Sequence, residues 1–203
     1  MKKLMSKKIR VFARISFIIL ALTMATANIT LAHCDTMDGP LVADARKAMA
    51  QNNINYALKW IPAANEKEVK DAFNLAMRVK GLNADAKELA ENYFFDTLVR
   101  IHRAAEGIPF TGVKPSGTPV DEKILAADKS LEIGNLSPLK GSIPEKDMPE
   151  LKERFQKAMS LKDFDVNNVP AGREYIEAYV QFFKFAEGEE AEAHHAVATE
   201  HLH

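Results

Sequence analysis

The sequence predicts an all-α fold, a helical bundle built from a tandem duplication of a three-helix unit. Apolar residues recur at helical spacing almost throughout from residue 41 onward. We find no alternation of apolar and polar residues long enough to indicate a half-buried strand. The chain also resembles itself when it is shifted by 82 residues, and such self-similarity indicates two copies of one supersecondary unit.

The first unit is expected over residues 41–107. Its first helix runs from residue 41 to the Asn-Asn pair at 52–53, and a short turn then closes at Ile61-Pro62. A second helix is expected over 66–81, and a third, longer helix begins after a cap at Asn83 or Asp85 and stops at Gly107. The apolar spacing predicts that the buried stripe of this third helix consists of Leu89, Tyr93, Phe94, Leu98, Ile101 and Ala105.

A Gly- and Pro-rich loop over 108–121 is expected to separate this unit from a second one over 122–188. The offset of 82 matches Asn53 with Asn135 and Ile61-Pro62 with Ile143-Pro144, and after one deletion the offset becomes 81. We expect the two copies to pack through their long third helices. At the shorter offset Phe183 replaces His102, which makes His102 a candidate for function, although sequence drift explains such differences equally well.

Residues 1–32 have the pattern of a secretory signal peptide. Six basic residues and no acidic one precede an apolar run, and Thr30 and Ala32 place small side chains where signal peptidase requires them. The alternative is a retained membrane anchor, but the strongly apolar run is shorter than the ~20 residues that a membrane span needs. We therefore expect a secreted or periplasmic protein, with no membrane attachment after processing.

The net charge and the single cysteine limit the classes of partner and the roles of the thiol that we expect. Removing residues 1–32 leaves 21 basic against 28 acidic residues, so the processed chain has a net charge near −7. This charge argues against nucleic acid and anionic membranes as partners. A lone cysteine in an oxidising compartment is an intermolecular partner, a reactive thiol or a metal ligand.

Residues 33–40 form a candidate metal hook. Cleavage after Ala32 would give His33 a free α-amine beside its imidazole, and the thiol of Cys34 follows directly. Thiolate, imidazole and amine or amide nitrogens together favour copper or nickel. Asp35 and Asp38 are expected to support the site.

His102 is the third candidate ligand. It shares one helix face with Glu106, which is one turn further on and is expected to accept the ring N–H of His102. The alternative is an ordinary partly buried histidine paired with Glu106. Residues 189–203 form a His- and Glu-rich tail, which is either a weak metal collector or a solvated terminus.

Two resemblances accompany these residues. The chain is similar to an uncharacterised family of secreted bacterial helical proteins, a domain of unknown function, whose members open with HCDTMDGP. Those members also carry segments similar to residues 94–103 and 112–118.

The second resemblance, to nickel superoxide dismutase, covers only the hook. His33, Cys34, Asp35 and Gly39 match its N-terminal segment, but its second cysteine falls at Asp38. That family uses the N-terminal amine, the histidine ring, a backbone amide and two cysteines as nickel ligands. The loss of one thiolate makes copper as plausible as nickel in this chain.

These observations predict a secreted metal-binding protein with a mononuclear copper or nickel site at its processed N-terminus. One hypothesis is a superoxide dismutase-like oxidoreductase acting on superoxide or another small oxygen species. The alternative is a non-catalytic periplasmic metal carrier or a partner-binding helical scaffold. The candidate partners also include further copies of the chain, as a homo-oligomer. A carrier should exchange its metal readily and show no turnover, which separates it from an enzyme.

Overall fold

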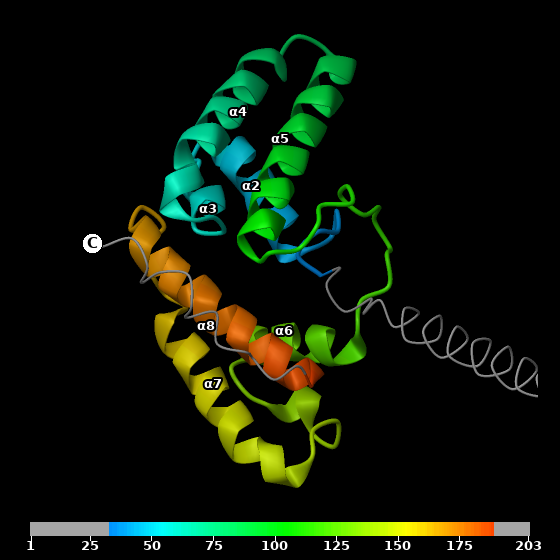
Figure 1. The fold of residues 1–203 in the computed structure, drawn as a ribbon, viewed down its shortest axis with the longest axis vertical. Coiled ribbons are helices and arrows are strands. Elements are labelled where there is room, and N and C mark those ends of the chain that lie inside the picture. Colours follow the sequence, from blue (N-terminus) through cyan, green and yellow to red (C-terminus); the bar gives the residue numbers. More distant parts are fainter. Residues whose placement is uncertain (1–32, 189–203) are drawn as a thin grey trace, which may run out of the picture. The chain divides into compact units, whose positions relative to one another are not determined.

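The computed structural model describes residues 33–188, and these residues confirm the predicted all-α fold (Figure 1). The helices are α2 (Pro40–Gln51), α3 (Asn55–Leu58), α4 (Glu66–Val79), α5 (Ala84–Ala105), α6 (Glu122–Ile133), α7 (Met148–Leu161) and α8 (Val169–Glu187). Over 33–188 no β-strand forms, and the only β-type pairing is an isolated bridge between Thr36 and Lys114. None of the described helices is long and apolar enough to cross a membrane. The expected signal peptide and the His/Glu-rich tail lie outside the described residues.

The first half of the described chain, which ends with α5, contains a pair of long helices, α4 and α5, with α2 packed against α5. Helix α4 lies along α5, and α2 packs on both α5 and α3 (Figure 1). The apolar face of α4 faces α5, so that the rings of Phe73 and Phe94 meet edge to face at 5.3 Å. As the sequence predicts, the side chain of Asn83 caps α5 by accepting from the amide of Ala86.

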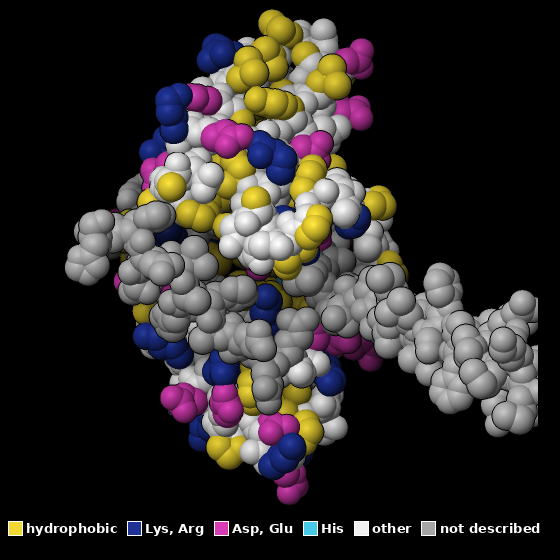
Figure 2. Space-filling view, viewed as in Figure 1, with side chains coloured by type: hydrophobic (Ala, Val, Ile, Leu, Met, Phe, Trp, Pro, Cys, Tyr) yellow, Lys and Arg dark blue, Asp and Glu magenta, His cyan; other side chains and the backbone are white. Residues whose placement is uncertain are grey.

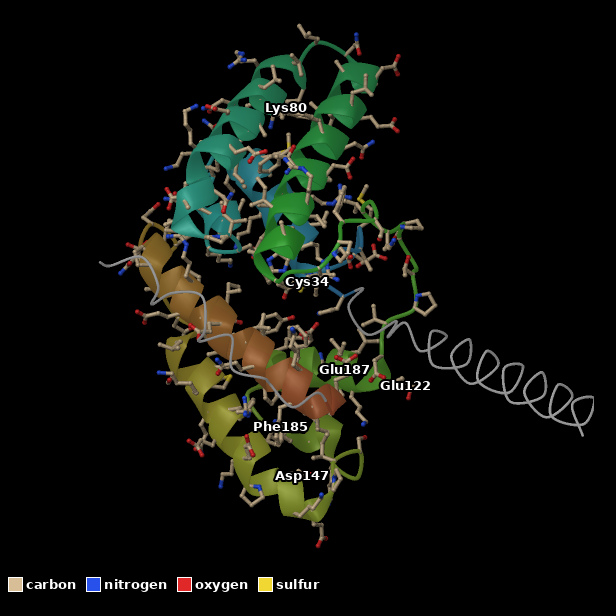
Figure 3. All side chains as sticks on the ribbon, in the orientation of Figure 1. Cys34, Lys80, Glu122, Asp147, Phe185 and Glu187 are labelled. Carbon is tan, nitrogen blue, oxygen red and sulfur yellow. The ribbon has the colours of Figure 1, made fainter. Side chains whose placement is uncertain are left out.

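The second half repeats this arrangement with α7 along α8 and α6 against α8. At an offset of 82, α2 and α6 are both 12 residues long, and α4 and α7 are both 14 residues long. The ammonium of Lys80 donates to the carbonyl of Met49, and Lys162 donates to Leu131 in the same way (Figure 3). The two halves therefore share one architecture over these helices, while their origin by duplication stays a prediction.

Two expectations about packing are wrong. Among the described helices, α5 packs mainly on α2 and α4 while α8 packs mainly on α6 and α7, so the long third helices do not form the main contact between the halves. Leu89 and Tyr93 are 71% and 47% exposed rather than buried, and Ala105 is also exposed. The buried surface of α5 includes Phe95 and His102 instead, and α2 packs on this helix.

Candidate functional site

Residues 33–39, the N-terminal segment, are held against the loop between the two halves. The amide of Lys114 donates to the carbonyl of Asp35 at 2.7 Å, and the amide of Met37 donates to the carbonyl of Lys114 at 2.8 Å. The carboxylate of Asp38 accepts from the hydroxyl of Ser116 and the amide of Gly117, which lowers the pKa of Asp38. Asp38 therefore fastens the loop to the segment and does not join the buried group described below.

His33 is buried, and its ring is fixed by two residues of the second half. Its Nε2 lies 2.8 Å from a carboxylate oxygen of Asp128 and 3.1 Å from the hydroxyl of Tyr179, which itself donates to Asp128 at 2.7 Å. Burial, and next the charge of Asp128, raise the pKa of Tyr179, so the phenol keeps its proton. A carboxylate acceptor requires a proton on Nε2, which leaves the lone pair of the neutral ring on Nδ1.

Cys34 follows His33 into the interior and is 5% exposed (Figure 3). Burial raises the pKa of its thiol, and the negative charges of Glu106, Asp35 and Asp128 add to this, while Arg103 opposes it. The thiol is therefore protonated at neutral pH when no cation is beside it. A metal ion is the usual agent that makes such a thiol ionise.

His102 lies near the end of α5 with one ring nitrogen bound and the other without a hydrogen bond. Its Nδ1 lies 2.8 Å from the backbone carbonyl of Trp60, so Nδ1 carries the proton and donates it. The buried Nε2 has no hydrogen-bond partner and lies 3.8 Å from Glu106 Oε2. The expected donation to Glu106 is therefore replaced by the bond from Nδ1 to Trp60, and Nε2 lies near Glu106 without a hydrogen bond.

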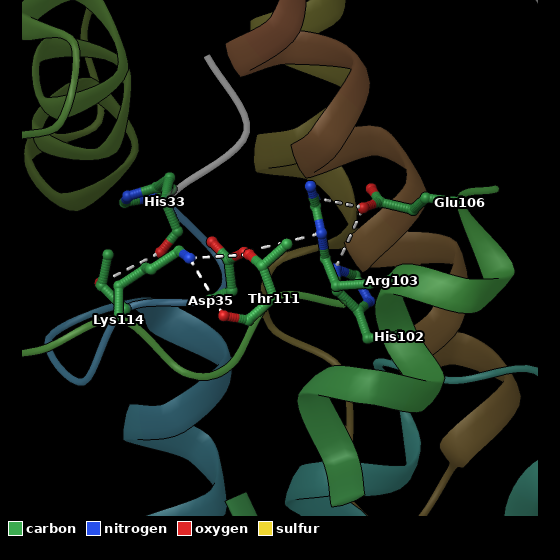
Figure 4. Close-up of polar contacts among 8 residues, drawn as sticks. His33, Asp35, His102, Arg103, Glu106, Thr111 and Lys114 are labelled. Carbon is green, nitrogen blue, oxygen red and sulfur yellow. Dashed lines mark hydrogen bonds and ion pairs between the residues drawn. The ribbon is translucent and has the colours of Figure 1, made fainter. Parts of the chain in front are cut away.

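A chain of charged groups links the N-terminal segment to the end of α5 (Figure 4). The guanidinium of Arg103 donates from Nη1 to Glu106 at 2.9 Å, and its Nε lies 3.7 Å from Asp35 Oδ2. Arg103 Nε and Asp35 Oδ1 are both buried and have no hydrogen-bond partner. Burial raises the pKa of Asp35, and Arg103 is the largest of the effects that oppose the rise.

The structure therefore brings together most of the residues that the sequence singled out. His33 and Cys34 share one interior location with Asp35, and Asp35 connects through Arg103 to Glu106 and His102 (Figure 4). Among residues 33–188, however, no three His, Cys, Asp or Glu side chains lie close enough to hold one metal ion as they stand. The site predicted from the sequence also uses main-chain nitrogens as ligands. A cluster of three side chains is therefore not required for it.

Sequence reasoning missed Asp128, Tyr179 and Arg103. Asp128 and Tyr179 lie far along the chain from His33, so no local spacing connects them to it. The repeat offsets place Arg46 opposite Asp128 and Leu98 opposite Tyr179. Both residues therefore differ from their counterparts in the first repeat, as His102 differs from Phe183. The comparison of the repeats that singled out His102 could have found them too.

The comparisons with known proteins identify the family. The model of a family of unknown function, DUF6448, matches residues 38–185. The chain belongs to this family. No curated protein and no solved structure matches the chain.

The matched span begins at Asp38 and thus leaves out His33 to Met37. The unmatched part of the N-terminal segment is nevertheless bonded to a loop and two helices of the matched part, through Lys114, Arg103 and Asp128. It is therefore integrated into the fold of the family domain.

Proposed function

We propose that the processed chain binds one copper or nickel ion at His33 and Cys34. The ligands are the α-amine and Nδ1 of His33, the thiolate of Cys34 and, after a shift of its ring, Nε2 of His102. Asp35 and Glu106 supply negative charge around the ion. Amine, imidazole and thiolate donors together suit copper or nickel better than magnesium or calcium.

The observation that carries this proposal is the charge of the buried group. The negative charges of three carboxylates, those of Asp35, Glu106 and Asp128, act on the thiol of Cys34, and among the described residues Arg103 is the buried cation beside Asp35 and Glu106. Asp35 and Glu106 have side chains only 8% and 17% exposed. Buried carboxylates that lack enough counter-charge are costly, so a bound cation would stabilise the group.

The orientation of the two histidines supports the same conclusion. Asp128 and Tyr179 occupy Nε2 of His33 and leave Nδ1 on the side of the ring that reaches its own α-amine. Such a carboxylate partner fixes the tautomer of a metal-binding histidine and raises its basicity. The Nε2 of His102 makes no hydrogen bond, and Trp60 holds the other ring nitrogen.

Two activities remain candidates for such a site. A superoxide dismutase-like oxidoreductase needs one tightly held redox metal that a small oxygen species can reach. The second candidate is a non-catalytic metal carrier or partner-binding scaffold of the periplasm or exterior. It is favoured by the burial of His33, Cys34 and His102, each of which is at most 6% exposed, because a substrate must reach a catalytic metal.

The test compares two chains that differ only before His33. One is processed to begin at His33, and the other carries one added glycine that moves the free amine away from the ring. Each is purified without chelators, checked by intact mass and titrated with copper and with nickel. We expect one ion per chain beginning at His33. The added glycine should weaken binding at least as much as removal of a supporting group, roughly 10- to 100-fold.

Two results would contradict the proposal. A chain beginning at His33 that takes up neither metal refutes the site, and equal affinity in the two chains refutes the role of the amine. If the metal binds, a superoxide assay separates the candidates, because an oxidoreductase turns superoxide over and a carrier does not. The variant Cys34→Ser should shift the absorption of the bound copper by removing the thiolate ligand.

A further inference from the structure

The single tryptophan of the chain and two of its four tyrosines form a row of rings beside the buried group. The rings of Trp60 and Tyr179 meet edge to face with their centres 6.1 Å apart, and those of Tyr179 and Tyr175 are stacked at 6.2 Å. Trp60 and Tyr179 are 4% and 5% exposed, whereas Tyr175 is only partly buried. The row therefore leads from the interior towards the surface.

The inner end of this row contacts both histidines of the buried group. The hydroxyl of Tyr179 lies 3.1 Å from Nε2 of His33. The carbonyl of Trp60 lies 2.8 Å from Nδ1 of His102, and the centres of the two rings are 5.8 Å apart. Electron transfer slows steeply as the separation between two groups grows. Oxidisable rings in contact therefore provide an efficient electron path between these histidines and Tyr175.

Both inner rings donate their polar hydrogen to a carboxylate. The phenol of Tyr179 donates to Asp128 at 2.7 Å, and the indole N–H of Trp60 donates to Asp44 at 2.8 Å. A tyrosine or tryptophan that loses an electron becomes a strong acid, and a hydrogen-bonded carboxylate accepts its proton directly. The negative charge of the carboxylate also stabilises the positive charge that oxidation creates. The two carboxylates therefore make these rings easier to oxidise than rings with neutral partners.

The other two tyrosines have different surroundings. Tyr56 donates to the neutral side-chain amide of Gln51 at 2.8 Å, and the ammonium of Lys47 lies 4.4 Å from the centre of its ring. A cation at that place opposes the loss of an electron. Tyr93 is 47% exposed on the hairpin of α4 and α5, where hydrophobic side chains are visible at the surface (top of Figure 2). A radical at Tyr93 is open to solvent, so the protected and hydrogen-bonded Tyr179 is where a long-lived radical is expected.

We propose that Tyr179 is a redox-active residue that carries single electrons between the buried group and the surface. In the forward step its ring loses one electron to a strong one-electron oxidant, such as a radical formed at the buried group from hydrogen peroxide. The phenolic proton moves to Asp128 and leaves a neutral phenoxyl radical. In the return step a small external reductant, such as ascorbate, gives one electron through Tyr175 and is itself oxidised by one electron, while Asp128 returns the proton.

This pathway removes an oxidising equivalent from the buried thiol and imidazoles before it damages them. Trp60 connects Tyr179 to His102, and the hydroxyl of Tyr179 contacts His33 directly. Neither step needs a metal ion, so the role of Tyr179 can be tested on metal-free protein, and its failure would leave the proposed metal site unaffected.

The test oxidises the metal-free processed chain with photogenerated ruthenium(III) tris(bipyridine), freezes the sample after a set delay and records the radical by electron paramagnetic resonance. Tyr179→Phe removes the oxidisable group. Asp128→Asn keeps an acceptor for the phenol but removes its charge, which imitates the surroundings of Tyr56. The control is Tyr56→Phe/Tyr93→Phe, which removes both tyrosines outside the row. Circular dichroism checks that each variant remains folded.

We expect the native chain and the control to hold the same amount of phenoxyl radical. Tyr179→Phe and Asp128→Asn should each hold at least about tenfold less after the same delay, since the second loses the stabilising charge. Tyr175→Phe should slow the quenching of the radical by ascorbate by about as much.

A radical that is lost in the control, or that persists in Tyr179→Phe, overturns the proposal. If Tyr179→Phe does not fold, Asp128→Asn decides, because a yield equal to that of the native chain shows that the carboxylate has no part in the oxidation. Unchanged quenching in Tyr175→Phe overturns the path to the surface.

Discussion

The two halves of the molecule agree closely in their first two long helices and differ where their third helices end. The helix pairs α2/α6 and α4/α7 agree in length, and Lys80 and Lys162 make corresponding bonds. Near the end of α5 a histidine and an arginine are buried, and the arginine lies 3.7 Å from Asp35 of the N-terminal segment. At the corresponding places α8 has Phe183, which is buried, and Lys184, which is partly exposed.

This difference separates the scaffold from the site. A core needs buried apolar surface, and Phe183 supplies that in the second half without any buried polar group to satisfy. The first half buries the polar pair His102 and Arg103 instead, at a cost that the packing of helices does not require. The polar end of α5 is therefore the part of the repeat that is specialised, and the N-terminal segment is what it faces.

The largest effect is expected when this specialised end is broken. Arg103→Met leaves Asp35 and Glu106 buried without their cation and should lower the free energy of unfolding by about 3–5 kcal/mol. The corresponding variant Lys184→Met should cost no more than about 1 kcal/mol, because that side chain is partly exposed. Urea unfolding of the metal-free protein measures both. Equal losses would show that the two helix ends do not differ in this way.

A smaller effect is expected at the N-termini of the first helices. Gly39 caps α2 without a side-chain bond, and a Cβ there would overlap the carbonyl oxygen of His33. Its counterpart Asp121 caps α6 by accepting from the amide of Lys123. Asp121→Ala should lose about 1 kcal/mol, as is typical for an N-cap.

Gly39→Ala should lose more than Asp121→Ala, about 2 kcal/mol or above, because the N-terminal segment must move. Thermal unfolding ranks the two variants, and alkylation of Cys34 in the folded protein reports displacement of the segment. Faster alkylation is expected only in Gly39→Ala. If Cys34 stays protected in that variant, the segment tolerates the added methyl group.

The sequence predicts the scaffold better than the site, for a physical reason. Helix periodicity and caps are local, so the bounds of α2 and the cap at Asn83 follow from neighbouring residues. The bonds of Lys114 to Asp35 and Met37, in contrast, join residues far apart in the chain. The partners of His33 come from helices α6 and α8, and such distant contacts leave no periodic pattern.

The exposed side chain of Leu89 also shows that local sequence patterns do not determine tertiary packing. Apolar spacing assigned Leu89 to the core, but whether a neighbouring helix reaches that turn of α5 depends on tertiary packing.

The smallest difference is expected between the two corresponding lysines. Lys80 donates to the last turn of α2 and Lys162 to the last turn of α6, in each case 31 residues back along the chain. Lys80→Met and Lys162→Met should each lose roughly 1–2 kcal/mol, because a charged donor to a partly buried carbonyl is removed while the aliphatic stem is kept. If the two halves share one scaffold, the two losses agree within about 0.5 kcal/mol in urea unfolding. Losses that differ by more than about 1 kcal/mol would mean that the same bond lies in unlike surroundings, and the correspondence of the halves would then extend to backbone geometry alone.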